Sequence, residues 1–279
     1  MPPKPPNLGQ MLLVAGALAL TALANHLALL RLRKPGNALR IAGKSLQYWA
    51  ICLGLAALAW HCSSRGSFLL PEDNFETLLA LALLLAIFVV YMQRVHPIPA
   101  LDLFMLPIVA LMLASAAIFG RFSPSLYHTD SDWSWAHRIS TFGSAIAFAV
   151  AAAGGGMYLI ASARLRRKDP SPATPLGNLE RLERITHTAA ASGFALLTIG
   201  MITGVLRILQ QGANTRLGPH WIASPKIWLA LGVWIVYALA LHTPINPAMR
   251  GRRSAVLSIV GFCLMFGTLI AVQFMPGDH

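Results

Sequence analysis

The sequence is poor in charged residues, which make up 11% of its 279 residues, whereas hydrophobic residues make up 56%. Soluble domains carry about 25% charged residues, so this scarcity argues against a chain built of soluble domains. Apolar runs instead follow one another, each long enough to cross a hydrocarbon core of about 30 Å, which needs about 20 residues. We therefore predict an all-α, polytopic membrane protein that forms a single transmembrane helical domain over residues 1–279.

Cysteine is also scarce, and its spacing excludes two kinds of site. Cys52, Cys62 and Cys263 form no pair with disulfide or metal-binding spacing, and the absence of a Cys-x-x-Cys-His motif excludes a c-type cytochrome. The sequence further lacks a glycine-rich nucleotide loop, a nucleophile–base constellation and paired carboxylates within a span. It thus contains no independent catalytic constellation, and whether the chain is part of an enzyme stays open.

The apolar runs predict eight transmembrane helices. Their approximate bounds are 11–30, 45–60, 75–92, 101–119, 137–163, 185–209, 227–241 and 255–274. Lys and Arg are concentrated after the first, third, fifth and seventh spans, so the positive-inside rule places these loops in the cytoplasm and both termini outside. The net charge of +12 follows this alternation, and we expect no nucleic-acid partner. The expected location is a bacterial inner (cytoplasmic) membrane, crossed several times.

An aromatic segment at the start of the seventh span suggests a ligand-binding surface. Residues 221–242 (WIASPKIWLALGVWIVYALALH) begin in a predicted polar loop, in which Trp221 and Trp228 flank Lys226. Tryptophans beside a cation offer a flat apolar surface with a positive rim, which suits a large planar ligand with anionic edges. An aromatic belt at the membrane interface explains the same residues, so both interpretations stay open.

Several motifs resemble the CcsA/ResC-type cytochrome c assembly proteins, which are haem-handling membrane proteins of the superfamily that includes CcmC and CcmF. The motifs are residues 74–78 (NFETL), His137, residues 193–200 (GFALLTIG) with Thr203-Gly204, Trp221 with Pro225-Lys226, residues 241–243 (LHT) and residues 250–262 (RGRRSAVLSIVGF). The resemblance is strongest over residues 176–279. It depends on the whole set, because none of the motifs would be specific alone.

The resemblance implies haem as the ligand, bound non-covalently as in b-type sites. Family members hold haem at the outer face in a tryptophan-rich loop, with two outer histidines as axial iron ligands and membrane histidines that help to bring haem there. By position, His137 and His279 correspond to the outer pair, which would bind the iron, and His242 to a membrane histidine. The remaining candidates for cofactor binding are Trp221, Lys226, Trp228 and, as a substitute outer ligand, His220.

Plainer roles compete for several histidines. His137 suits an interfacial anchor, and His242 suits a cap at a cytoplasmic helix end. Capping or helix–helix hydrogen bonds are the favoured roles of His26 and His187. His61 is expected at the surface or the membrane interface.

The tryptophan-rich loop differs from the family pattern. Ala223 and Ser224 stand where the family has a tryptophan and an aspartate, and Ile227 stands where it has an acid. Two functions therefore remain. One is a component of cytochrome c maturation that presents haem to apocytochrome c with a second membrane subunit and would form part of a haem-attachment synthase. The other is a haem-free membrane scaffold or regulator that keeps the fold without the site.

Overall fold

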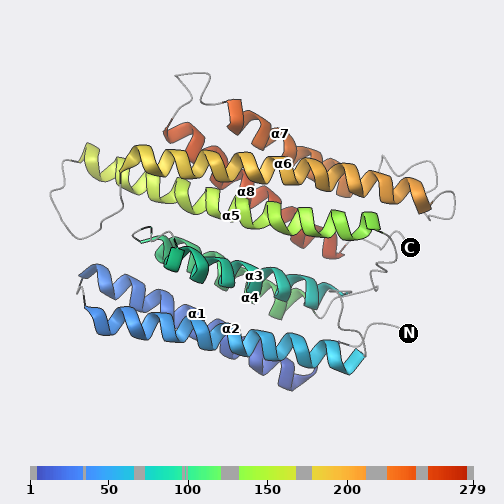
Figure 1. Cartoon of the computed structure of the whole chain (residues 1–279), viewed down its shortest axis with the longest axis horizontal. Coiled ribbons are helices and arrows are strands. Elements are labelled where there is room, and N and C mark those ends of the chain that lie inside the picture. Colours follow the sequence, from blue (N-terminus) through green and yellow to red (C-terminus); the bar gives the residue numbers. More distant parts are fainter. Residues whose placement is uncertain are drawn as a thin grey trace. The chain divides into compact units, whose positions relative to one another are not determined.

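The computed structural model describes residues 5–33, 36–65, 73–95, 98, 100–120, 132–167, 178–211, 225–242 and 251–274. Eight helices account for nearly all of these residues, and no strand occurs among them (Figure 1). They are α1 (Leu8–Arg33), α2 (Asn37–Arg65), α3 (Asn74–Val95), α4 (Leu101–Phe119), α5 (Asp132–Arg166), α6 (Leu179–Gln211), α7 (Pro225–His242) and α8 (Arg252–Phe274).

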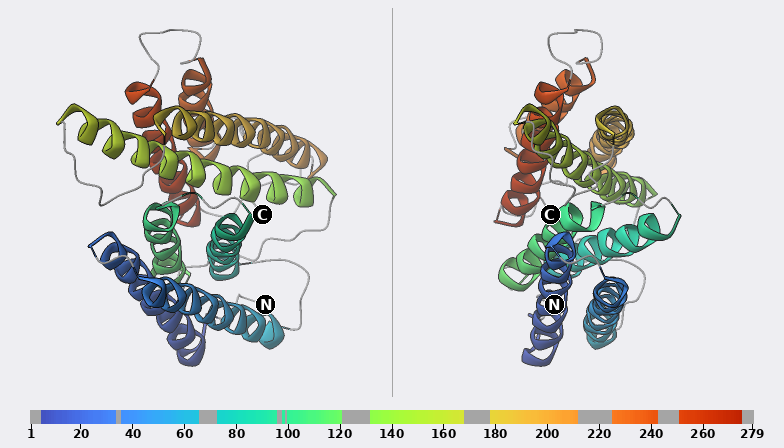
Figure 2. Two further views of the ribbon diagram at one scale, coloured as in Figure 1. Left: turned by 60° about the vertical axis from the view of Figure 1, so that its left-hand side comes forward. Right: turned by 90° about the vertical axis from the view of Figure 1, so that its left-hand side faces the viewer.

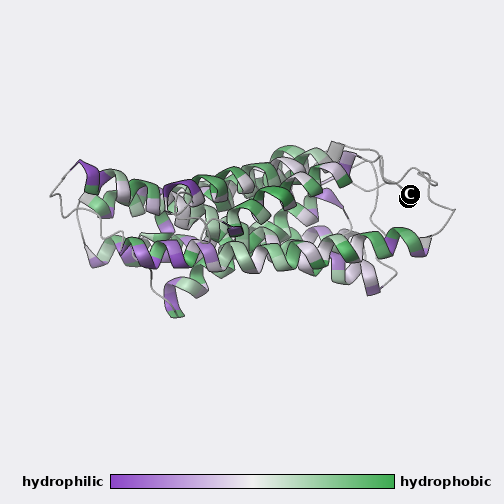
Figure 3. Ribbon diagram, turned by 90° about the horizontal axis from the view of Figure 1, so that it is seen from above, coloured by the Kyte–Doolittle hydropathy of each residue, from purple (hydrophilic) through white to green (hydrophobic). Residues whose placement is uncertain are grey.

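All eight helices are long and apolar enough to cross a membrane. Hydrophobic residues cover most of their length, and the polar residues gather towards helix ends (Figure 3). The prediction of an all-α protein with eight transmembrane helices is thus confirmed, and the chain is an integral, multi-pass membrane protein. The N-out/C-out orientation stays a prediction.

Two helices begin earlier than the apolar pattern predicted. The fifth span was expected near residue 137, but α5 begins at Asp132 and includes Trp135. An acid in the first turn is favourable because it faces the positive end of the helix dipole. The polar loop expected around Trp228 is also wrong in part, since α7 begins at Pro225. Proline is favourable in the first turn of a helix, where its missing N–H costs no hydrogen bond.

The helices pack as two compact units, each described here by itself. Unit 1 contains α1 to α4, and unit 2 contains α5 to α8. In unit 1 the most extensive contact is between α1 and α2, and in unit 2 it is between α5 and α6, which run side by side in Figures 1 and 2. The single domain over residues 1–279 stays a prediction.

Small residues allow close helix contacts inside unit 2. A Cβ atom on Gly154 would lie 2.5 Å from the hydroxyl oxygen of Thr186 in α6, and one on Gly155 would lie 2.8 Å from the backbone oxygen of Ala255 in α8. Both distances are too short for a real Cβ. Gly154 and Gly155 therefore allow α5 to pack closely against α6 and α8.

Polar contacts in unit 1 gather at the two ends of its helices. At one end, Arg31 of α1 pairs with Asp102 of α4, and Arg94 of α3 donates a hydrogen bond to the hydroxyl of Tyr48 in α2 at 2.7 Å. At the other end lie the last turns of α2 and the start of α3. This second end is built around a buried histidine.

Candidate haem-binding site

His137 lies in the second turn of α5 and is held against α6. Its Nδ1 lies 2.7 Å from the carbonyl oxygen of Gly200. Because a carbonyl oxygen only accepts hydrogen bonds, Nδ1 carries the proton and donates it. The neutral ring therefore has its lone pair on Nε2, and Nε2 makes no hydrogen bond within the described part of the chain. A metal-binding histidine has this arrangement, in which a bond at one nitrogen orients the other.

Two glycines of α6 allow it to approach α5 closely at this ring and at the next turn. A Cβ atom on Gly204 would lie 3.0 Å from Nδ1 of His137, closer than an ordinary van der Waals contact. Gly200 faces the next turn of α5, where a Cβ atom would lie 3.3 Å from the hydroxyl of Ser140. Residues four apart lie on one face of a helix, so both glycines belong to a single surface. That surface seats the imidazole and fixes its tilt.

Two arginines surround the imidazole with positive charge. Arg138 of α5 and Arg207 of α6 are both electrostatic neighbours of His137. Guanidinium groups bind carboxylates through paired, charge-assisted hydrogen bonds. Arg207 is not among the site residues predicted from the sequence. Arg207 follows Gly204 by three residues and so lies on a nearby face of α6. This spacing could have predicted that it lies near the histidine.

The register of unit 2 brings the start of α7 to the level of His137. Residues of α5 and α6 pair antiparallel, because Gly204 lies against His137 while Gly193 lies against Phe148. Phe148 also stacks on Tyr237 of α7, with ring centroids 3.5 Å apart. In α5, His137 precedes Phe148 by as many residues as the first turn of α7 precedes Tyr237. The first turn of α7 therefore lies at the level of His137.

A second contact leads to the same level. The indole N–H of Trp234 donates to the hydroxyl of Thr198 in α6 at 3.0 Å. Six residues correspond to about 9 Å along a helix. Towards the same end of unit 2, Trp228 lies six residues from Trp234 in α7, and Gly204 lies six residues from Thr198 in α6. Lys226 and Trp228 thus lie level with the histidine. The Trp228 side chain is 60% exposed, so it faces away from the packed interior of unit 2.

Comparison with known proteins decides the family. Residues 44–277 match the profile of the family described as "Cytochrome C assembly protein". The chain belongs to the cytochrome c assembly protein family. This membership confirms the resemblance that was carried by its motifs.

Individual relatives of this cytochrome c assembly protein match parts of it. The cytochrome c biogenesis protein CcsA of Prochlorococcus marinus (strain NATL2A) is 36% identical over 98 residues, which are 35% of this chain and 30% of the relative. The CcsA protein of Synechococcus sp. (strain CC9605) is 27% identical over 168 residues, which are 60% of this chain and 50% of the relative. The matched region thus spans half or less of these curated relatives.

A solved structure shows a similar fold. The protein described as "Cytochrome c Heme Lyase CcmF" matches 99% of this chain and 48% of its own chain, with a TM-score of 0.64 and 17% sequence identity. At this identity the likeness is one of fold alone.

His242 lies at the far end of α7 from the other candidates in this family member. It follows Lys226 by 16 residues, about 24 Å along a helix. Its side chain is exposed, and its Nδ1 donates to the carbonyl oxygen of Ala238 at 2.7 Å. The observed contact is therefore the helix-end cap considered from the sequence. Its role as a membrane histidine stays a prediction.

Three predicted site residues, His220, Trp221 and His279, lie outside the described residues. Helix α8 ends at Phe274, five residues before His279.

The roles of two further histidines stayed open. His26 is exposed on α1, whereas Nε2 of His187 is buried without a hydrogen-bond partner within the described ranges. The cofactor-binding set therefore remains a prediction, of which His137, Lys226 and Trp228 are placed at one level of unit 2.

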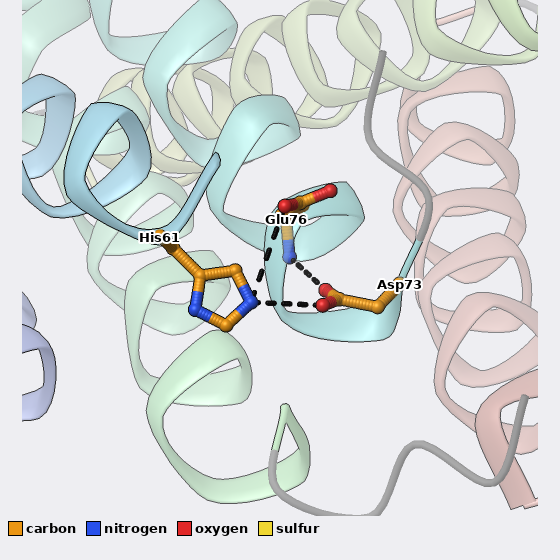
Figure 4. Close-up of side chains that lie close together, drawn as sticks. All are labelled: His61, Asp73 and Glu76. Atoms are coloured by element: carbon orange, nitrogen blue, oxygen red, sulfur yellow. Dashed lines mark hydrogen bonds and ion pairs between the residues drawn. The ribbon is translucent and has the colours of Figure 1, made fainter. Parts of the chain in front are cut away.

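The expectation for His61 was wrong. Instead of lying at the surface, it is 1% exposed and contacts the carboxylates of Asp73 and Glu76 (Figure 4). No local pattern predicts this cluster, because His61 is in α2 whereas the two acids lie at the start of α3, and they meet only when α2 packs against α3. It lies in unit 1 and includes none of the candidate haem-binding residues.

Proposed function

We propose that this chain acts in cytochrome c maturation, where it binds haem non-covalently at the outer face of the membrane and presents it to apocytochrome c. One observation carries the proposal: His137 donates through Nδ1 to the Gly200 carbonyl oxygen at 2.7 Å, which leaves Nε2 to bind a metal. Membership of the cytochrome c assembly protein family supports it.

A haem has three needs, and the described residues offer candidates for each of them. Iron requires an axial nitrogen ligand, the ring requires an apolar surface, and the propionates require cations or hydrogen-bond donors. His137 supplies the nitrogen, and Trp228 at the start of α7 supplies apolar surface. Arg138 and Arg207 supply the cations beside the histidine, with Lys226 at the same level. His279 would be the second axial ligand.

In this function the chain binds and orients its cargo. Haem supplies the vinyl carbons to which the cysteine thiols of apocytochrome c become attached. The fixed tautomer of His137 would keep Nε2 available to bind the iron, because rotation of the ring would break the bond to Gly200. The arginines would hold the propionates, and so decide which ring edge is presented.

The partners follow from this role. We propose a second membrane subunit and apocytochrome c as partners, in a bacterial inner membrane. The predicted N-out/C-out orientation places the start of α5 at the outer face, where apocytochrome c is met. The protein would then contribute to a haem-attachment synthase.

The test is a visible absorption spectrum of the full chain purified from haem-replete cells. We expect a Soret band that is strongly weakened in His137→Ala. His26→Ala is the matched control, because this imidazole is exposed on α1 and belongs to the other unit. Equal Soret bands in wild type and His137→Ala would refute the assignment of His137.

A haem-free scaffold or regulator is the second candidate. The residues Ala223, Ser224 and Ile227, which replace the family's tryptophan and acids, favour it. It predicts that wild-type protein from haem-replete cells shows no Soret band and does not acquire one when haemin is added. A saturable band that depends on His137 would exclude this alternative.

A further inference from the structure

A buried cluster of metal-ligating side chains lies where the last turns of α2 meet the start of α3. The side chains of His61, Asp73 and Glu76 are 1%, 3% and 0% exposed. Nε2 of His61 lies 2.9 Å from Oδ2 of Asp73 and 4.0 Å from Oε1 of Glu76. One ligand atom from each residue lies within 4.8 Å of the others. Figure 4 shows the imidazole directed at the two carboxylates.

The start of α3 fixes the position of the first carboxylate. Asp73 is the residue before the helix, and its Oδ1 accepts a hydrogen bond from the backbone N–H of Glu76 at 2.8 Å. Aspartate is a favoured N-cap because it satisfies a backbone donor that has no partner within the helix. Since Oδ1 serves the cap, Oδ2 faces His61. The local sequence therefore holds both carboxylates at one helix end.

Gln10 of α1 fixes the tautomer of the imidazole. The side-chain oxygen of Gln10 accepts from the backbone N–H of Asn7 at 2.9 Å, and the backbone N–H of Gln10 donates to the side chain of Asn7 at 2.9 Å. That same Gln10 oxygen lies 3.1 Å from Nδ1 of His61. An amide oxygen only accepts, so Nδ1 donates. In the neutral ring, the lone pair of Nε2 then faces the two carboxylates.

The ligand spacing suits a small cation. Zinc binds nitrogen and oxygen at about 2.0–2.1 Å in tetrahedral sites, which places neighbouring ligand atoms about 3.3–3.4 Å apart. The two distances from Nε2, 2.9 and 4.0 Å, lie on either side of this value. The ring of Phe75, whose centroid is 4.9 Å from that of His61, shields the cluster from solvent and strengthens its electrostatic interactions.

We propose that His61 Nε2, Asp73 Oδ2 and Glu76 Oε1 bind a divalent transition-metal ion, for which Zn²⁺ is the best match. An imidazole with two carboxylates is a donor set of intermediate softness, whereas Ca²⁺ and Mg²⁺ prefer oxygen ligands alone. The ion would link α2 to α3, and Gln10, through its bond to Nδ1, would position the histidine from α1. The site therefore ties one end of three helices of unit 1 together.

The test is metal binding by the full chain in detergent. Elemental analysis of protein purified without chelator is expected to find about one zinc ion per chain, counted apart from any haem iron. After chelator treatment, Co²⁺ is expected to bind with the visible absorption of a low-symmetry site and to be displaced by Zn²⁺. His61→Gln should abolish this binding. His26→Gln, which removes an exposed imidazole from α1, should leave it unchanged.

Two further variants separate metal binding from folding. Asp73→Asn removes a charged ligand but keeps a side-chain oxygen that can cap α3, so it should fold and lose the metal. Gln10→Leu should weaken binding about 10- to 100-fold, as expected when the partner of a metal-bound histidine is lost. Circular dichroism checks that each variant is helical. If His61→Gln is unfolded, the loss of Co²⁺ binding in folded Asp73→Asn carries the test.

Two results would overturn the proposal: wild-type protein that binds neither Zn²⁺ nor Co²⁺, or equal Co²⁺ binding by wild type and folded Asp73→Asn. Either result would make the cluster a hydrogen-bonded network that only joins helices. The outcome is independent of haem binding. His137→Ala should keep the metal whether or not it loses the Soret band, because the cluster belongs entirely to unit 1.

Discussion

At His137 the two ring nitrogens have different surroundings, and this difference decides what the residue can bind. Nδ1 is committed to the Gly200 carbonyl oxygen, and the ring edge beside it rests on Gly204. A histidine that served only as an interfacial anchor would not require a neighbouring helix to lack a side chain at this point. The close fit of ring and glycine therefore favours a histidine that must keep one orientation.

Gly204→Ala tests whether the seat of the imidazole matters. The added Cβ would lie 3.0 Å from Nδ1, so the ring must tilt and its bond to Gly200 must lengthen. We expect haem binding to weaken by about 10- to 100-fold, the effect of disturbing the partner of a metal ligand. Haemin titration followed at the Soret band measures it.

Gly232→Ala in α7 is the matched control, because no atom of the described residues, apart from its own stretch of helix, lies within 4 Å of the position of its Cβ. It should bind haemin like wild type and be slightly more stable, since alanine is favoured over glycine in a helix by about 0.5–1 kcal/mol. Identical haem affinities for Gly204→Ala and Gly232→Ala would show that the ring orientation is unimportant.

The sequence predicted single residues better than their partners. His137 was found from its position in the family motifs, and the structure places it in a helix as expected. Its partner Gly200 follows 63 residues later, and no local pattern links the two. His61 was misjudged for the same reason. Its environment depends on Asp73 and Gln10, which belong to other elements, and the polar residues after it indicated a surface position.

At the scale of helices, the apolar runs predicted existence and order but not length. A hydrocarbon core of about 30 Å needs about 20 residues, whereas α5 has 35 residues and α6 has 33. The additional turns are polar, so hydropathy alone does not reveal them. The missed turns include Trp135 and the start of α7. Charged residues, tryptophan and proline are common in loops, but they are equally compatible with the first turn of a helix.

Close packing in unit 2 leads to a prediction for Gly155. A Cβ atom there would lie 2.8 Å from the backbone oxygen of Ala255, and a backbone atom cannot move aside as a flexible side chain can. Gly155→Ala should therefore separate α5 from α8 and destabilise the fold by about 1–3 kcal/mol, the cost of overpacking. Thermal unfolding in detergent, followed by circular dichroism, measures the change.

The control for this prediction is Gly267→Ala in α8, where the added Cβ would have no neighbour within 4 Å among the described residues outside its own stretch of helix. It should unfold at or slightly above the wild-type temperature. Should Gly155→Ala be as stable as Gly267→Ala, the contact between the two helices would be looser than the structure describes.

At the scale of the whole molecule, eight crossings return the chain to the side on which it began. Unit 2 then has the start of α5, the end of α6, the start of α7 and the end of α8 at one membrane face, together with His137 and Lys226. Which face this is cannot follow from packing, because a helix bundle is the same in either orientation. It follows only from the distribution of Lys and Arg between the loops.

The orientation can be tested with single cysteines on either side of α5. In a background with the three native cysteines replaced by alanine, Ser125→Cys and Ser171→Cys report on the loops before and after this helix. The bases at the end of α5 and directly after it, which include Arg164, Arg166 and Arg167, predict that residue 171 is cytoplasmic. A membrane-impermeant maleimide should therefore label the first variant in intact cells and the second only after permeabilisation. The reverse pattern would put the His137 end of unit 2 in the cytoplasm. Haem held there would be separated by the bilayer from an apocytochrome on the other side, so the proposed presentation would fail even if the Soret band depended on His137.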